Sequence, residues 1–312
     1  MHATSAAARA FVAVLVIAAG ASIAGVGSPA AAAPRCFGAA ARDPVHPCLN
    51  TAKTVTALDD PDRPAHVPCR AQDDAQLQVC AFGASRASAR ATFALVGDSH
   101  AAQWLPALAV VARARHWRGL LVTTSGCYFS AAVTRFLPGA REGCTRWYRS
   151  ALGWFGHHPE VGTAFVAQRT TTPITVKPGE TSLALKAAGF RRTWEALPPT
   201  VTHVLAIRDV PESSNPQFNC LAGVVAAGLA PGPTCVLPRQ SVLKADPAVA
   251  AVRSLHARRY RTIDLTPYFC SRRSCFAVVG GVLVHRDIDH ITAAYSRSLG
   301  PYLLRAVRRL VA

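Results

Sequence analysis

The 312-residue sequence lacks most of the features that mark an integral membrane protein or a metalloenzyme. No long hydrophobic run follows the N-terminal segment, which excludes a multi-span membrane region within this sequence. Cys-x-x-Cys pairs are missing and the histidines are scattered, which argues against a zinc site. The Gly-Asn-His signature that a metallophosphoesterase needs is missing too, and no cofactor is predicted.

Acidic residues are also scarce. Seventeen acidic residues stand against 34 basic ones, which gives a formal net charge of +17. A basic surface outside the cytoplasm favours polyanionic partners. We therefore expect a cell-wall polysaccharide or an anionic glycolipid as the partner. Nucleic acid is not predicted, because no nucleic-acid-binding motif occurs in the sequence.

The N-terminal segment predicts export. Residues 1–33 combine a short basic start, an apolar core over Phe11–Val26 and an Ala-x-Ala cleavage site near residues 30–33. We interpret this segment as a signal peptide, with an uncleaved N-terminal anchor as the alternative. After cleavage the protein would be secreted, periplasmic or associated with the cell wall.

The ten cysteines agree with an oxidising compartment, because they form an even set and all follow residue 33. Sequence alone leaves on the order of 900 pairings open. We favour the pairing of sequence neighbours, because every loop closed in this way is short. The favoured pairs are Cys36–Cys48, Cys69–Cys80, Cys127–Cys144, Cys220–Cys235 and Cys270–Cys275.

The pattern of apolar segments divides the mature chain in two. Residues 34–90 show little periodicity and carry four cysteines, which predicts an irregular, disulfide-pinned extension. From residue 91 strands and helices alternate, which predicts a catalytic domain over 91–312 with a mainly parallel sheet and helices on both faces, a three-layer α/β/α sandwich. The expected strands are 92–96, 119–124, 163–168, 202–207 and 260–265, and the expected helices 100–115, 142–156, 181–197, 246–258 and 291–311, with a loop region after 207.

Two short motifs predict a serine-dependent acyl-transfer site. Gly97-Asp98-Ser99-His100 follows the first of these strands and places a serine at a strand-to-helix turn. A serine hydroxyl needs a base, and the base needs a group that orients it. His290 and Asp287, three residues apart before the last helix, would supply both, with Asp289 as the alternative orienting group. An ordinary capped turn is the alternative for the whole motif.

The residues around these motifs carry a family resemblance. Val96–His100 followed by Gln103–Pro106, together with Gly280–Thr292, resemble the SGNH (GDSL-like) hydrolases. They are most similar to the extracytoplasmic SGNH domain of membrane acyltransferases that O-acetylate bacterial polysaccharides. The resemblance covers roughly residues 36–310. It implies an SGNH/flavodoxin-like fold, catalysis by Ser99, His290 and Asp287, and a separate membrane acyltransferase as the acyl donor.

The sequence departs from the family at the oxyanion hole. Gly126, after the second strand, matches the glycine that many SGNH enzymes use there. The asparagine expected after the third strand is replaced by Gln168 and Arg169, which we name as candidate donors. We predict a secreted carbohydrate O-acyl transferase or esterase, acting on O-acetyl groups through an acyl-enzyme. The alternative is a non-catalytic cell-wall or glycan-binding protein on a degenerate SGNH scaffold.

Overall fold

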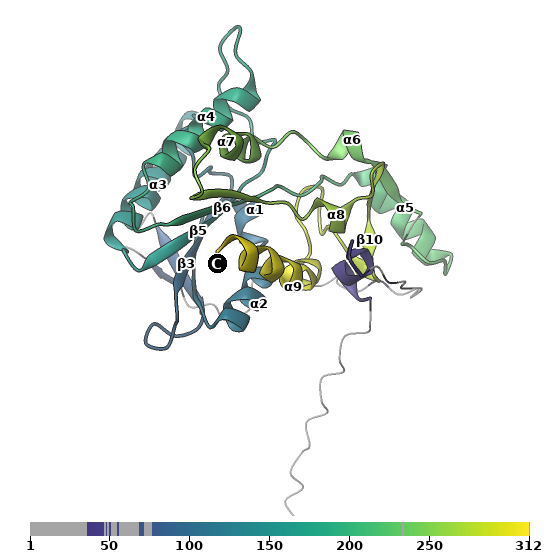
Figure 1. The fold of residues 1–312 in the computed structure, drawn as a ribbon. Coiled ribbons are helices and arrows are strands. Elements are labelled where there is room, and N and C mark those ends of the chain that lie inside the picture. Colours follow the sequence, from purple (N-terminus) through teal and green to yellow (C-terminus); the bar gives the residue numbers. More distant parts are fainter. Residues whose placement is uncertain are drawn as a thin grey trace, which may run out of the picture. The chain divides into compact units, whose positions relative to one another are not determined.

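A seven-stranded mixed sheet with the order β1-β2-β4-β3-β5-β6-β8 forms the centre of the computed structural model (Figure 1). The structure describes residues 36–46, 48, 50, 55, 69–71, 77–232 and 234–311, so the predicted signal peptide lies outside the described residues. The five strands from β4 to β8 run parallel, and β1 and β2 are antiparallel at one edge. The strands are β1 Cys69–Ala71, β2 Gln78–Gly83, β3 Thr92–Gly97, β4 Arg118–Thr123, β5 Val161–Ala167, β6 His203–Ile207 and β8 Tyr260–Ile263.

Helices cover both faces of this sheet. In the central strand β3, Phe93 and Leu95 belong to the core on one face, and Ala94 and Val96 to the core on the other. A strand buried on both faces is typical of a parallel sheet between two helical layers. The three-layer α/β/α sandwich is therefore confirmed. One layer contains α2 (Leu105–Arg115) and α9 (Ala293–Leu310), and the other contains α3 (Pro138–His157), α4 (Ser182–Glu195) and α7 (Pro247–Leu255).

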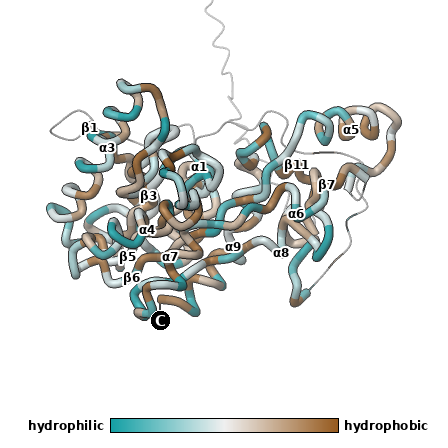
Figure 2. The backbone as a smooth tube through the Cα atoms, turned by 90° about the horizontal axis from the view of Figure 1, so that it is seen from above, coloured by the Kyte–Doolittle hydropathy of each residue, from teal (hydrophilic) through white to brown (hydrophobic). Residues whose placement is uncertain are grey.

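The hydropathy of the helices agrees with this layering. Figure 2 shows hydrophilic and hydrophobic turns alternating along α3. Trp147, Ala151 and Phe155 of α3 are buried at spacings of four residues, which places them on one side of the helix. Polar residues between them remain exposed, so α3 buries one face against the sheet.

Two strands join the sheet from the segment that the sequence predicts to be irregular. β2 pairs with β4, with Cys80 opposite Leu121, and β1 pairs with β2, with Cys69 opposite Cys80. The described part of this segment therefore contributes the antiparallel edge of the sheet. β1 has three residues and is exposed along its whole length, and the burial of β2 does not alternate, so neither leaves a clear alternating pattern in the sequence.

The helices differ from expectation at two places. The helix predicted over 100–115 is broken at Gln103 and Trp104 into α1 (Ser99–Ala102) and α2, because Pro106 has no N–H to continue the hydrogen-bond ladder. The expected loop after residue 207 contains a helix, α5 (Asn215–Ala226), which Ser214 caps by accepting a hydrogen bond from the N–H of Gln217. The remaining elements are η1 Gly38–Arg42, β7 Val236–Pro238, α6 Arg239–Val242, α8 Thr266–Phe269, β9 Ser274–Phe276, β10 Val278–Val279 and β11 Val282–Leu283.

All ten cysteines are paired with their sequence neighbours, as predicted. The paired residues are 5 to 17 positions apart along the chain. Loops of about 15 residues closed by a disulfide each stabilise a fold by roughly 3 kcal/mol through the denatured state. The bridge between Cys69 and Cys80 also joins β1 to β2 and so fixes the short edge strand to the sheet.

Candidate active site

Ser99 lies where β3 ends and α1 begins, at the edge of the sheet that collects the carboxyl ends of the parallel strands. Gly97 adopts a φ of 149°, and a Cβ there would collide with the carbonyl oxygen of Ala167. Asp98 caps α1 by accepting a hydrogen bond from the N–H of His100 at 2.9 Å. The glycine permits the turn and the aspartate fixes it, so the Ser99 side chain is presented at the strand end.

The loop before α9 brings His290 to this serine, 191 positions away along the chain. The Nε2 atom of His290 lies 2.8 Å from Oγ of Ser99. The loop is held by the backbone bond from Arg286 N–H to the His290 carbonyl, at 3.0 Å, and by Thr292, which caps α9. The Gln103 side chain joins α1 to the same loop, because its Oε1 accepts a hydrogen bond from Ile291 N–H at 2.8 Å. Both motif blocks thus meet at one point of the sheet edge.

Two carboxylates contact the other side of the His290 ring. Both oxygens of Asp287 lie 3.0 Å from Nδ1, and Oδ1 of Asp289 lies 2.8 Å from the same atom. Asp287 also accepts hydrogen bonds from the backbone N–H groups of Asp289 and His290, at 3.0 and 2.7 Å. Asp289 is more buried, and its Oδ2 pairs with the guanidinium of Arg169 at 2.9 Å. Both candidates for the orienting group are therefore within reach of the imidazole.

A second carboxylate–histidine pair lies beside the first, and the sequence analysis did not identify it. His100 is buried, its Nδ1 lies 2.7 Å from Oδ1 of Asp209, and its ring centroid lies 4.8 Å from that of His290. The other oxygen of Asp209 accepts a hydrogen bond from Thr170 N–H at 2.7 Å. The position of Asp209 directly after β6 is the only sequence signal for this pair, since strand ends collect at the site.

The contact with Asp209 raises the pKa of His100. Burial alone would lower the pKa of His100, but the Asp209 carboxylate, with smaller effects from Asp98 and Asp289, raises it to about 9. His100 is therefore an imidazolium at neutral pH, and among the described residues its Nε2 has no hydrogen-bond partner.

For Asp287, burial acts to raise the pKa, but hydrogen bonds from the His290 side chain and from backbone N–H groups hold it well below its usual range. Asp287 stays ionised.

The His100–Asp209 pair predicts a loss of stability in mild alkali. A folded-state pKa above the unfolded value of about 6.5 means that the stabilisation is present below pH 6.5 and is lost as pH rises through about 9. The shift corresponds to a contribution on the order of 3 kcal/mol. We expect the melting temperature of the wild-type protein to fall between pH 6.5 and 9.5. His100→Gln should melt lower at pH 6.5 and change less over this range, as should Asp209→Asn, whereas parallel curves for all three proteins would contradict the assignment.

The three candidate oxyanion donors lie at different places around the site. Gly126 is in the loop after β4, next to Ser125, which lines the same cavity as Ser99. Gln168 is buried directly after β5, and its Oε1 has no partner among the described residues. The Arg169 side chain is occupied by its contacts to Asp289 and Thr171. Neither Gln168 nor Arg169 lines the cavity at Ser99, so the oxyanion role of all three stays a prediction.

The cavity that contains Ser99 is small, at about 130 Å³. Ligand pockets for drug-sized molecules measure about 300–1,000 Å³. The space beside Ser99 therefore fits a short acyl group rather than a long chain. Its walls come from α1 and the start of α2, from the end of β4 and the loop after it, and from the His290 loop and the start of α9, namely Ala102, Gln103, Pro106, Thr123, Thr124, Ser125, Arg286, Ile291 and Ala293.

The polar side chains of the site also include one potential metal-ligand group. His100, Asp289 and His290 each offer a ligand atom, and these atoms lie within 4.8 Å of one another. A metal ion there would compete with contacts that His290 already makes, to Ser99 through Nε2 and to Asp287 and Asp289 through Nδ1. These contacts also suit a different use, in which His290 takes the proton of Ser99 and a carboxylate orients the imidazole.

A three-layer sandwich with a serine and a histidine in contact at its carboxyl edge resembles the arrangement of serine-dependent α/β hydrolases and acyltransferases. A family model described as the SGNH domain fused to AT3 domains matches residues 68–305, that is 238 of the 312 residues. The chain therefore belongs to the SGNH domain family. The match begins at the edge strand β1 and ends within α9.

The fold is also similar to a solved structure, the periplasmic domain of a lipopolysaccharide acetyltransferase of Salmonella ser. Paratyphi A. The similarity has a TM-score of 0.53 at 11% identity and covers 72% of this chain and 84% of that one. At this identity it supports the fold. No curated protein matches the sequence. Among the described residues, no helix has the length and apolarity needed to cross a membrane.

Proposed function

We propose that the protein is an extracytoplasmic carbohydrate O-acyl transferase or esterase that works through an acyl-enzyme on Ser99. The observation that carries this proposal is the contact of 2.8 Å between Ser99 Oγ and His290 Nε2, with carboxylates on the Nδ1 side of the same ring. Such a line of contacts gives a serine hydroxyl the base that it lacks at neutral pH. Membership of the SGNH family supports the same chemistry.

In the proposed first step, Ser99 Oγ attacks the carbonyl carbon of an ester and His290 Nε2 takes the hydroxyl proton. Asp287 holds the Nδ1–H of His290 and stabilises the imidazolium that forms. Ser99 N–H is at the first position of α1, where no intrahelical acceptor exists, so it can donate to the oxyanion together with Gly126 N–H. The tetrahedral intermediate then expels the alcohol, which receives the proton from His290.

In the second step, His290 removes a proton from the acceptor, which attacks the acyl-enzyme and releases Ser99. Water as the acceptor gives an esterase, and a sugar hydroxyl gives a transferase. The cavity of about 130 Å³ favours an acetyl group. The solved structure with a similar fold is the periplasmic domain of a lipopolysaccharide acetyltransferase, which favours a polysaccharide or glycolipid as the acceptor.

The proposed location is outside the cytoplasm. The signal peptide predicted over 1–33 and the five disulfides support an oxidising compartment. The family model describes domains fused to AT3 domains, and we infer that a separate membrane acyltransferase supplies the acyl group to Ser99.

Covalent labelling tests the proposal directly. We expect a fluorophosphonate probe to react at Ser99, detected by intact mass and peptide mapping. The labelled protein should lose its ability to hydrolyse p-nitrophenyl acetate. In a separate reaction with the unlabelled protein, a glycan acceptor is added together with the ester. The mass of the acceptor should show whether the acetyl group goes to water or to the sugar. A protein that neither labels at Ser99 nor hydrolyses the ester would instead be a glycan-binding module on this scaffold.

A further inference from the structure

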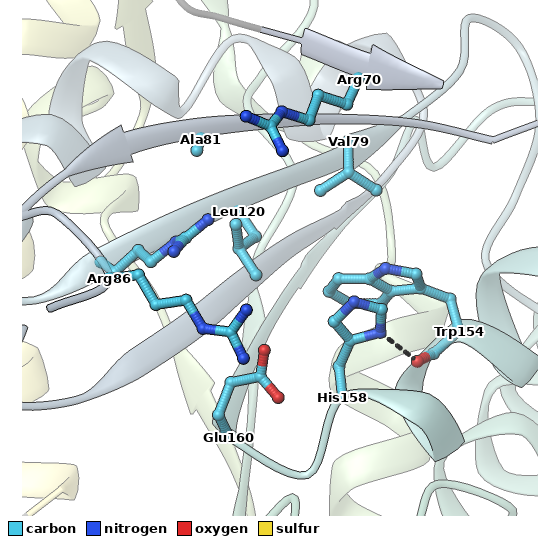
Figure 3. Close-up of a pocket in the computed structure, with 9 residues that line it drawn as sticks. Arg70, Val79, Ala81, Arg86, Leu120, Trp154, His158 and Glu160 are labelled. Atoms are coloured by element: carbon cyan, nitrogen blue, oxygen red, sulfur yellow. Dashed lines mark hydrogen bonds between the residues drawn. The ribbon is translucent and has the colours of Figure 1, made fainter. Parts of the chain in front are cut away.

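A second cavity, of about 440 Å³, lies on the α3 side of the sheet at its antiparallel edge (Figure 3). Its floor is apolar and buried, formed by Val79 of β2, Leu120 of β4 and Trp154 of α3. The volume falls within the range of small-molecule pockets, about 300–1,000 Å³. None of its lining residues belongs to the site around Ser99.

Three arginines surround this floor. Arg70 comes from β1, Arg118 begins β4, and Arg86 comes from the turn between β2 and β3. Arg70 is opposite Val79 in the strand register, next to the Cys69–Cys80 bridge, which fixes its place. No carboxylate among the described residues lies within ion-pair distance of these guanidinium groups. Three arginines against the single carboxylate of Glu160 leave this cavity with an excess of positive charge, which favours an anionic ligand.

The opposite wall carries groups suited to sugar hydroxyls. Trp154 and His158 are stacked with ring centroids 4.2 Å apart, and the Nδ1–H of His158 donates to the carbonyl of Trp154 at 2.8 Å. Because a carbonyl oxygen only accepts, this bond places a hydrogen on Nδ1 and leaves Nε2 for a ligand hydroxyl. Figure 3 shows the Glu160 carboxylate across the cavity, beside the Arg86 guanidinium, where it is a further acceptor for a hydroxyl. The hollow therefore combines an apolar floor, hydroxyl acceptors and anion donors.

The cavity is remote from Ser99. Arg118 is the first residue of β4, and Glu160 directly precedes β5, so this part of the cavity lies at the amino ends of these parallel strands. Val79 and Arg70 extend the cavity along β2 and β1. Ser99 lies at their carboxyl ends. Six strand residues at about 3.3 Å each separate the two ends by roughly 20 Å. A molecule that occupies this cavity and reaches Ser99 must be a polymer of several sugar units.

From these observations we infer a subsite for an anionic glycan at Arg70, Arg86, Arg118, His158 and Glu160. Sugar rings pack on the apolar floor, their carboxylate or phosphate groups bind the guanidinium groups, and their hydroxyls donate to Glu160 and to Nε2 of His158. An anionic membrane surface fits less well, because the apolar residues form a buried floor rather than a protruding rim. The role of this subsite in holding an acceptor polymer rests on the proposed function, whereas the binding itself does not.

Calorimetric titration of the full-length mature protein tests the subsite. The ligands are a galacturonic acid tetramer, glucose 6-phosphate and the neutral maltotetraose. We expect at least one of the two anionic sugars to bind more tightly than maltotetraose. The comparison of the galacturonic acid tetramer with glucose 6-phosphate identifies carboxylate or phosphate as the preferred group. Arg86→Ala/Arg118→Ala should weaken this binding by about tenfold or more, because two charge-assisted hydrogen bonds are lost.

The matched control is Arg272→Ala/Arg273→Ala. These exposed arginines lie beside another hollow, of about 400 Å³, which has no aromatic wall. The control removes the same charge and should weaken binding by less than about twofold. Equal weakening in both double variants would mean general attraction to a basic protein and would overturn the subsite. So would no preference of the wild type for anionic sugars, or binding only to phosphatidylglycerol vesicles.

The two proposals fail separately. Ser99→Ala should bind the anionic sugar as well as the wild type, because Ser99 lines a separate cavity that shares no residue with the subsite. Arg86→Ala/Arg118→Ala should hydrolyse p-nitrophenyl acetate at the wild-type rate and raise KM only for a polymeric substrate. A wild-type protein that hydrolyses the ester but has no preference for anionic sugars therefore overturns the subsite alone. A wild-type protein that binds an anionic sugar at this subsite but neither labels at Ser99 nor hydrolyses the ester overturns the proposed function alone.

Discussion

Replacing Ser99 by alanine is expected to reduce the hydrolysis of p-nitrophenyl acetate by roughly 10⁴-fold or more, and His290→Ala by a similar factor. The reason is the contact of 2.8 Å between their side chains, through which the serine loses its proton as it attacks. Members of such a unit do not contribute additively, so the double variant should be no slower than either single variant. The measurement is kcat/KM for the three variants and the wild type.

His46→Ala provides the matched control. His46 belongs to the other Asp-x-x-His sequence of the chain, Asp43 to His46, and is exposed. Asp43 of that sequence pairs with Arg305 of α9, with Nη2 and Oδ2 3.2 Å apart, which is a structural contact. His46→Ala should therefore retain full activity. Wild-type turnover by Ser99→Ala would overturn the proposed mechanism.

The sequence predicted the layers of the fold because strong local signals specify them. The run from Phe93 to Val96 is apolar on both faces, which indicates a central parallel strand. The break at Gln103 and Trp104 was missed because it depends on one proline, Pro106, in an otherwise helical pattern. The strands β1 and β2 were missed because β1 is short and exposed and the burial of β2 does not alternate, so the pairing of β2 with β4 depends on the rest of the fold.

For the site, motif spacing predicted that Ser99, Asp287 and His290 lie together, and it could not predict the groups around them. Ser99, Asp287 and His290 stand in short local patterns. His100 and Asp209 are 109 positions apart, and their contact exists only because β3 and β6 end at the same edge of the sheet. The contact of Asp289 with both His290 and Arg169 was likewise a matter of loop geometry, although Asp289 was recognised as an alternative to Asp287.

The second large expected effect distinguishes Asp287 from Asp289 as the group that orients His290. Asp287→Asn should lower kcat by roughly 10³–10⁴-fold, because an amide in this place can hold the wrong tautomer of His290. The carboxylate of Asp287 is kept ionised by backbone N–H groups and faces Nδ1 with both oxygens. Asp289 is closer to Nδ1, but its charge is balanced by Arg169. Asp289→Asn should therefore cost only about tenfold, in line with a lost secondary contact.

The pH dependence of kcat/KM separates an orienting role from loss of folding. Each variant should keep the near-ultraviolet spectrum of the wild type, which shows that it is folded. The Asp287→Asn variant should show a lower apparent pKa on the acidic limb of the kcat/KM profile, because removing a negative charge beside an imidazole disfavours the protonated form of that imidazole. Arg169→Ala leaves Asp289 without its cationic partner and should move the same limb to higher pH. A larger loss in Asp289→Asn than in Asp287→Asn would reverse the assignment. It would make the Arg169–Asp289 pair, which is the more buried of the two arrangements, the support of the catalytic histidine.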